Sequence, residues 1–140
     1  MSRDTRTIAP TATPAMFQQQ VASLFDRPRA EARITAGAEA ANVRRFTIQV
    51  VDRMGKEWGR RWLVQFWTTD TASGAPSGSH TLAFVAGTAI QTIAANQHYL
   101  AETDANGKIV VDLTVAGVSS RWVKACVVEQ INDSGEVAWA

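Results

Sequence analysis

The segment IVVDLTV, residues 109–115, is the clearest β-strand in the chain. Every second residue from Ile109 to Val115 is a branched apolar side chain, which is the period of a strand with one buried face. Directly before it, residues 104–107 read DANG, which favours a tight turn because Asn and Gly tolerate positive φ angles. The segment therefore predicts a strand that follows a turn and lines a core.

Similar alternation occurs along most of the chain. Phe46, Ile48 and Val50 alternate with polar residues, and residues 62–67 carry bulky side chains on both faces, which indicates a central strand. A Ser/Gly/Pro-rich loop is expected at 70–80. Further short strands are expected at 81–85, 89–95, 97–103, 121–130 and 136–140, and 33–36 is either a loop or a short strand. This pattern predicts an all-β fold, an antiparallel β-sandwich of jelly-roll or immunoglobulin-like type, because a parallel sheet would need helices between its strands.

The N-terminal part has a different pattern. Residues 1–13 are polar and rich in Thr, Ala and Pro, which predicts an extended arm. A Thr-Pro pair then suits the start of a helix, and apolar residues on one helical face predict a short helix over about 14–26. We therefore expect an N-terminal arm with one short helix over 1–42 and a β-sandwich domain over 43–140. Two alternatives stay open for the arm, docking on a partner and terminal disorder.

The composition of the 140-residue chain allows one domain with its own core and excludes several classes of protein. Lys plus Arg is 14 and Asp plus Glu is 13, and the formal charge of +1 gives no field that attracts nucleic acid or an anionic membrane. The one cysteine, Cys126, excludes a disulfide within the chain and a thiolate metal cluster. The N-terminus has no apolar signal segment, and no apolar run approaches the ~20 residues that span a bilayer. We expect no nucleic-acid partner and no membrane partner.

The sequence holds no pattern typical of catalysis. His80 and His98 have no Cys, Asp or Glu at a metal-ligand spacing, and the segment 77–80 places hydroxyls beside an imidazole without an orienting carboxylate. Cys126 lies in an apolar strand, where a thiol is expected to be a small buried hydrophobic group. Phosphate-binding glycine motifs are absent. We therefore expect no enzyme activity, no cofactor, no metal and no small-molecule substrate.

Two groups of residues are candidates for binding a protein partner. Three lysines stand against eleven arginines, and Arg suits bidentate pairing at protein interfaces, so protein contact is favoured over nucleic-acid binding. Five tryptophans are more than a thin sandwich buries, which places one or two at an interface, or else on a sugar-binding platform. The first group is a basic patch of Arg44, Trp58, Arg60 and Arg61. The second is apolar and N-terminal, consisting of Ile8, Phe17, Val21, Leu24 and Phe25.

One resemblance adds to these residue patterns. It rests on RFTIQVVDR at 45–53, on Gly55 and Trp58, on RWLV at 61–64 with Trp67, on GAPS at 74–77 and on TDANGK at 103–108. Over roughly 43–130 the sequence resembles small β-sandwich virion proteins of tailed bacteriophages, of the capsid cement or decoration type, as in a short-tailed Bordetella phage. The same segments also resemble immunoglobulin-like domains of tail or fibre proteins.

The resemblance implies a structural role. Proteins of this type bind the outside of the major capsid protein shell, bridge its subunits and act as homo-oligomers, with a dimer favoured here and a trimer as the other choice. It places the chain on the outer capsid surface after synthesis in the host cytoplasm. The alternative that it implies is an accessory β-sandwich domain of a tail or fibre, which binds a receptor or carbohydrate.

Overall fold

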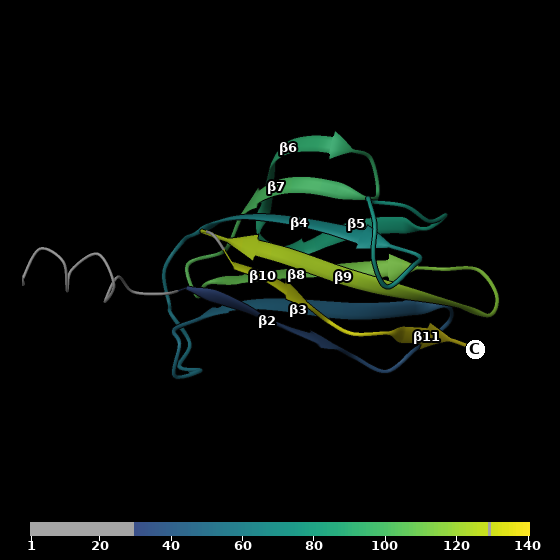
Figure 1. The fold of residues 1–140 in the computed structure, drawn as a ribbon, viewed down its shortest axis with the longest axis horizontal. Helices are drawn as coiled ribbons and strands as arrows, with labels where there is room; N and C mark the ends of the chain where they lie inside the picture. The colour runs from purple at the N-terminus through teal and green to yellow at the C-terminus, as the bar shows by residue number, and fades with distance from the viewer. Residues whose placement is uncertain (1–29, 129) are drawn as a thin grey trace, which may run out of the picture.

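The computed structural model describes residues 30–128 and 130–140, and this part of the chain is a two-layered β-sandwich (Figure 1). The strands are β2 (Glu31–Ala36), β3 (Val43–Val51), β4 (Leu63–Thr69), β5 (Thr81–Ala86), β6 (Thr88–Ala94), β7 (His98–Glu102), β8 (Lys108–Thr114), β9 (Ser119–Val127), β10 (Gln130–Asp133) and β11 (Val137–Trp139). The predicted arm and helix, and with them the boundaries 1–13 and 14–26, lie outside the described residues.

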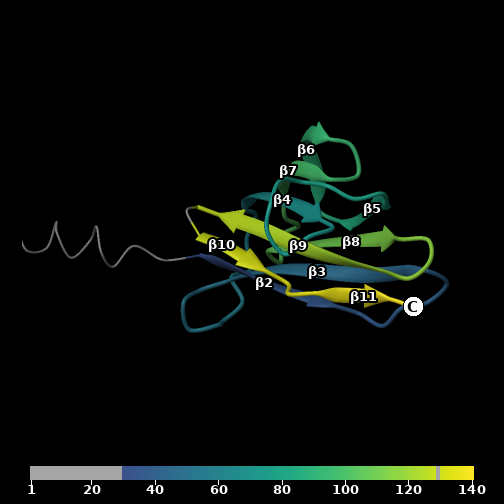
Figure 2. The same ribbon diagram turned by 45° about the vertical axis from the view of Figure 1, so that its right-hand side comes forward.

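The strand order is of the immunoglobulin type. The first sheet has the order β2-β3-β8-β5, and the second has β10-β9-β4-β7-β6, with β11 also paired to β9. All pairs between these strands are antiparallel. With β2, β3, β4, β5, β8, β9 and β10 taken as strands A to G, the orders are A-B-E-D and G-F-C, those of immunoglobulin constant domains. The hairpin β6–β7 extends the second sheet beyond β4 (Figure 2). It also contacts the first sheet, because Tyr99 of β7 packs against Phe84 of β5 with 5.3 Å between the ring centroids.

The core lies between the two sheets and confirms the predicted alternation. Phe46, Ile48 and Val50 from β3 are fully buried, and so are the inward residues of the 109–115 segment. From the second sheet, Val64 and Phe66 of the central strand β4 enter the same core. Apolar burial of this kind stabilises by roughly 25 cal/mol per Å², so these inward residues account for the fold.

The first strand corrects the predicted domain boundary. β2 pairs with β3 along its whole length, and Ala30 and Ala32 are buried in the common core. The Ala32 amide also donates to Asn132 Oδ1 of β10 at 3.0 Å, which joins the two sheets along one side. The division into 1–42 and 43–140 is therefore wrong, because the sandwich begins before residue 43. The strand alternative for 33–36 is the correct one.

Two further predictions change at β9. The strand expected over 121–130 ends at Val127, where Val128 has a positive φ of 62°, and β10 begins at Gln130. The expectation that Cys126 is buried is wrong, because it lies half-exposed on the outward side of β9. Alternation explains this: Val123, Ala125 and Val127 take the inward positions.

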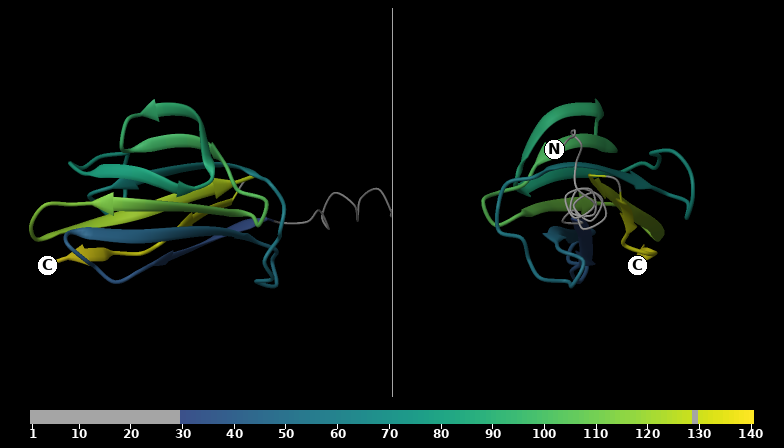
Figure 3. Two further views of the ribbon diagram at one scale, coloured as in Figure 1. Left: turned by 180° about the vertical axis from the view of Figure 1, so that it is seen from behind. Right: turned by 60° about the vertical axis from the view of Figure 1, so that its left-hand side comes forward.

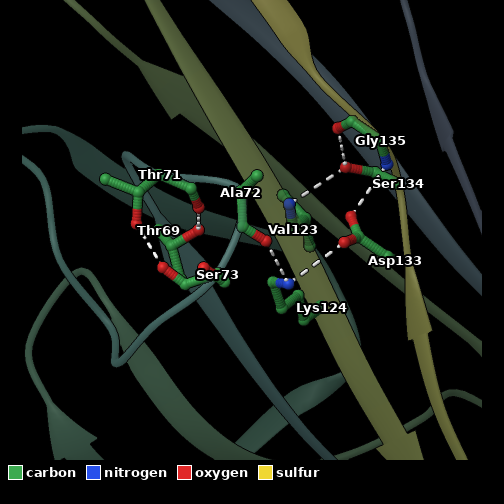
Figure 4. A network of polar contacts seen from close by, with 9 residues as sticks. All are labelled: Thr69, Thr71, Ala72, Ser73, Val123, Lys124, Asp133, Ser134 and Gly135. Carbon is green, nitrogen blue, oxygen red and sulfur yellow. Dashed lines mark hydrogen bonds and ion pairs between the residues drawn. The ribbon is translucent and has the colours of Figure 1, made fainter.

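The 70–80 loop is tied to the outer side of β9 (Figure 4). The Lys124 ammonium donates to the Ala72 carbonyl at 2.8 Å and lies 3.1 Å from Asp133 Oδ2. The Ser134 hydroxyl accepts from the Val123 amide at 2.9 Å just where β10 ends. Part of the loop is thus held against one end of the second sheet rather than projecting from it.

The opposite end of the sandwich is closed by the 52–62 loop. The two ends are distinct in Figure 3, because β2 enters at one and the C-terminus lies at the other. Gly107, with φ 76°, lies directly beneath this loop, and a Cβ there would collide with the Trp58 carbonyl oxygen. Gln49 Nε2 donates to the Asn106 carbonyl at 3.1 Å. The Asn-Gly turn predicted from the sequence therefore also positions the loop that holds Trp58 and Arg60.

Candidate interaction surface

The outer face of the second sheet has an uncharged central row. The registers align Ile131 of β10, Cys126 of β9, Gln65 of β4, Leu100 of β7 and Gln91 of β6 in one row across five strands. Directly opposed residues in a sheet point to the same side, and Ile131 and Gln65 are exposed, so the row faces outward. We call this surface the uncharged face and define it by Leu63, Gln65, Trp67, Gln91, His98, Leu100, Cys126 and Ile131.

Apolar groups on the uncharged face are unusually open to solvent. Leu63 is 58% exposed and Ile131 is 60% exposed, although both lie within regular strands. Trp67 lies half-exposed beside His98, with 5.7 Å between the ring centroids. These apolar groups share one outward face with the polar Gln65, and exposed apolar groups gathered on one face suit a binding surface.

His98 is neutral in this arrangement. Its Nε2 lies 2.7 Å from the Gln65 amide nitrogen, which is a donor only, so Nε2 accepts and Nδ1 carries the proton. Partial burial lowers the pKa of His98 below its usual value. His98 therefore adds no charge to this face at neutral pH.

Charged groups on this side of the sheet, among the described residues, lie in the rows that flank the central one: Lys124 is directly opposite Trp67, and Glu102 is directly opposite Leu63. Lys124 and Asp133 pair at 3.1 Å at the end where the 70–80 loop lies. Arg61 Nη1 and Glu102 Oε1 lie 3.8 Å apart at the other end. Exposed ion pairs contribute little to stability, about 0.2–1 kcal/mol, but they leave no single charge at the centre of the surface.

An aromatic cluster borders the face beside Arg61. Arg60 stacks on Trp62, with 4.0 Å from its guanidinium carbon to the ring centroid, and lies 5.4 Å from that of Trp58. The two Trp rings pack edge to face at 5.0 Å. The buried Trp62 Nε1 has no hydrogen-bond partner among the described residues. We call Trp58, Arg60 and Trp62 the aromatic cap.

The predicted basic patch is divided by the structure. Trp58, Arg60 and Arg61 lie together on the 52–62 loop, whereas Arg44 lies near the start of β3, at the other end of that strand. Arg44 donates to the Gly37 carbonyl at 2.7 Å and to the Ala138 carbonyl at 2.9 Å. Arg44 is therefore not part of the same surface. Ile8, Phe17, Val21, Leu24 and Phe25 lie outside the described residues.

The uncharged face was not predicted from the sequence. Its residues come from five separate strands and meet only through the sheet register, which sequence spacing does not reveal. One signal was present, namely bulk on both faces of 62–67. We expected the outward side chains of this strand to pack against a neighbouring element, but Leu63 is exposed.

A polar cluster at the 70–80 loop is internally satisfied. His80 Nε2 lies 2.7 Å from the Thr68 hydroxyl, and Arg121 Nε donates to His80 Nδ1 at 3.2 Å. The proton therefore resides on Nε2, and burial together with the Arg121 charge lowers the pKa of His80. The Ser77 hydroxyl donates to Asp70 at 2.7 Å rather than to His80. This geometry is not that of a serine nucleophile with its base.

Comparisons with known proteins do not identify a family for this chain. No protein-family model matches the chain, and no curated protein matches it. A solved structure with some similarity is the GAE domain of GGA2p from Saccharomyces cerevisiae, which is 11% identical over 81% of this chain and 89% of that chain, with a TM-score of 0.31. Within the described residues, no group of three His, Cys, Asp or Glu residues is arranged to hold a metal ion. The same residues contain no helix long and apolar enough to cross a membrane.

Proposed function

We propose that this chain is a non-enzymatic structural protein of a tailed-phage virion, a cement or decoration protein. In this role it binds the outside of the major capsid protein shell, bridges neighbouring subunits and works as a homo-oligomer. The resemblance of residues 43–130 to such proteins motivates the proposal. The single structural observation that supports it is the uncharged face, a broad outward surface on a rigid sandwich.

The chemistry of the described residues supports binding over catalysis. The ring nitrogens of His80 and the Ser77 hydroxyl are occupied by neighbouring side chains, so neither is poised for a substrate. Apolar and aromatic side chains with one stacked arginine instead resemble the composition of protein interfaces. Many such contacts, each weak, stabilise a shell when they are repeated over hundreds of copies.

The first test is the abundance of the chain in purified virions, relative to the major capsid protein, by quantitative mass spectrometry. A decoration protein is expected at hundreds of copies per particle, because each copy bridges only its local neighbours. A tail or fibre protein would be present at about three to eighteen copies, in keeping with the small cyclic symmetry of such assemblies. Complete absence from the particle would reject both roles.

A second test uses a deletion of residues 1–28. Because the core begins at Ala30, the shortened chain is expected to keep its β-sheet circular dichroism and a cooperative thermal transition. We expect it to lose binding to shells, since the N-terminal segment is the second predicted docking element. Retained binding would show that the sandwich alone holds the capsid. A chain that no longer folds would mean that the N-terminal segment is part of the core.

The alternative function is an accessory domain of a tail or fibre that binds a receptor or carbohydrate. The aromatic cap favours it, because half-exposed Trp rings beside a guanidinium suit stacking against a sugar ring. Glycan binding that is lost in Trp58→Ala but kept in Trp67→Ala, together with low copy number, would support this alternative.

A further inference from the structure

We propose that the uncharged face is the surface through which two copies of this chain associate face to face. This association rests on the proposed function and deepens it by naming the surface used for homo-oligomerisation. Three features of the described residues carry it: the uncharged central row, the paired charges at its margin and the bulged edge beside it.

The central row makes a second copy an electrostatically suitable occupant. In a twofold interface each residue near the axis meets its own copy, so a charged residue there would face a like charge. Ile131, Cys126, Gln65, Leu100 and Gln91 carry no charge. Two copies can therefore bring these rows together without burying an unpaired charge, which is strongly unfavourable.

The ion pairs beside the central row are also compatible with association of two identical copies. Lys124 with Asp133 and Arg61 with Glu102 are each paired within one copy, at opposite ends of the face. A partner of strong net charge would gain nothing from them. A second copy, with the same formal net charge of +1, brings the same neutral centre and the same paired rim. The surface therefore resembles the apolar core and polar rim of a protein interface.

Association through the β6 edge of the sheet is disfavoured. The register of β6 against β7 shifts between Ala89 and Gln91, and again between Thr92 and Ala94, which leaves Ile90 and Ile93 without partners on β7. Two bulges within a seven-residue strand distort its free edge, and bulged edges resist the addition of another strand. Strand addition at the β6 edge is therefore disfavoured, and the outward face beside it is the surface that we propose for association.

The size of the face predicts a weak dimer. The residues that define the face each occupy about 4.8 Å across the strands by about 6.7 Å along them, which together gives roughly 260 Å² per copy before side-chain relief. A standard stable interface buries about 800 Å² per partner, so we expect a weak dimer, with dissociation no tighter than the micromolar range. On a shell that holds the copies close together, such an affinity is sufficient.

The experiment is sedimentation velocity of the purified full-length chain from about 1 to 200 µM, a range that brackets a micromolar dissociation constant. The wild type is expected to shift from monomer to dimer within this range. Ile131→Lys places a cation in the central row at a position that is already 60% exposed, so the fold is unaffected and the dimer is lost. Val85→Lys is the matched control, because Val85 is a branched residue, 50% exposed, on edge strand β5 of the other sheet.

Each outcome decides the inference. A dimer that is abolished by Ile131→Lys and kept in Val85→Lys supports it. A wild type that is monomeric throughout the range, or a dimer equally sensitive to both variants, overturns it. Monomeric wild type whose shell binding is lost in Ile131→Lys would assign the face to the capsid protein instead. The abundance of the chain in virions is measured separately, so the surface can fail while the proposed function stands.

Discussion

The two outer faces of the sandwich differ sharply, although both sheets enclose one core. The first sheet turns Arg33, Arg45, Lys108 and Asp112 outward, and Arg45 forms a two-bonded ion pair with Asp112 at 2.8 and 3.0 Å. The second sheet turns Leu63, Trp67, Leu100 and Ile131 outward around an uncharged centre. Inward residues determine the fold, whereas outward residues determine which side of the molecule remains in water.

Electrostatics sharpen the same contrast. The hydrogen bond and charge of Arg45 lower the pKa of Asp112, so this carboxylate stays ionised on the first face well below neutral pH. On the second face, burial lowers the pKa of His98 and keeps it neutral. The first face thus keeps an ionised pair well below neutral pH. On the second face His98 adds no charge, and the charged groups beside the central row are paired with one another.

The largest expected effect on stability comes from disrupting the contact between Gly107 and the 52–62 loop, at the end of the sandwich that this loop closes. Gly107→Ala forces a collision with the Trp58 carbonyl at a positive φ of 76° and should destabilise the fold by about 2–4 kcal/mol in urea unfolding. Gly117→Ala is the control, since Gly117 has φ 79° with no atom within 4 Å of its Cβ position. It should cost only about 1 kcal/mol, for backbone strain alone. Equal losses would mean that the loop moves aside freely.

The next largest effect is a pH dependence of the folding stability, which arises from the partly buried His80 rather than from either outer face. Because the pKa of His80 is lowered in the folded state by burial and by Arg121, the unfolded chain binds more protons below the ordinary value of 6.5. The folding stability should therefore be fully present above pH 6.5 and fall as the pH decreases below it. In His80→Gln, urea unfolding at about pH 8 and about pH 5, on either side of that value, should differ less than in the wild type. An unchanged difference would assign the pH effect to other groups.

A smaller effect is expected at the aromatic cap beside the uncharged face. Arg60→Ala removes a cation that stacks on Trp62 at 4.0 Å and should cost about 0.5–1 kcal/mol, the range for exposed cation–π contacts. Arg53→Ala, on the same loop and exposed, should cost less than about 0.5 kcal/mol. If both variants lose the same free energy of unfolding, the stacking of Arg60 on Trp62 does not stabilise the fold. Arg60 would then be available to bind a partner.

The smallest effect is expected within the uncharged face. Cys126→Ser replaces a half-exposed outward thiol by a hydroxyl of similar size, and the free energy of unfolding should change by less than about 0.5 kcal/mol. Thermal unfolding at low protein concentration checks this. A loss of several kcal/mol would show that the thiol is part of the core, as its apolar strand had suggested.

Sequence patterns predicted the core far better than the surface. Alternation at Phe46 and over 109–115 predicted the right inward residues, because strand periodicity is a local property. The start of β2 was missed because Ala30 and Ala32 are small and helix-favouring, and only pairing with β3 places them in the core. Arg44 was grouped with Arg60 because spacing along the chain does not show that a whole strand separates them.

Our central claim is that the uncharged face is covered by a second copy while the charged face remains in water. Its most direct test is the reaction of Cys126 with a thiol reagent as the protein concentration rises. The matched probe is Thr47→Cys in a Cys126→Ser background, which places one thiol on the outward side of the first sheet. We predict that the Cys126 reaction slows as the concentration rises, while the reaction of the thiol introduced at position 47 does not. Rates that are independent of concentration at both positions would contradict the claim.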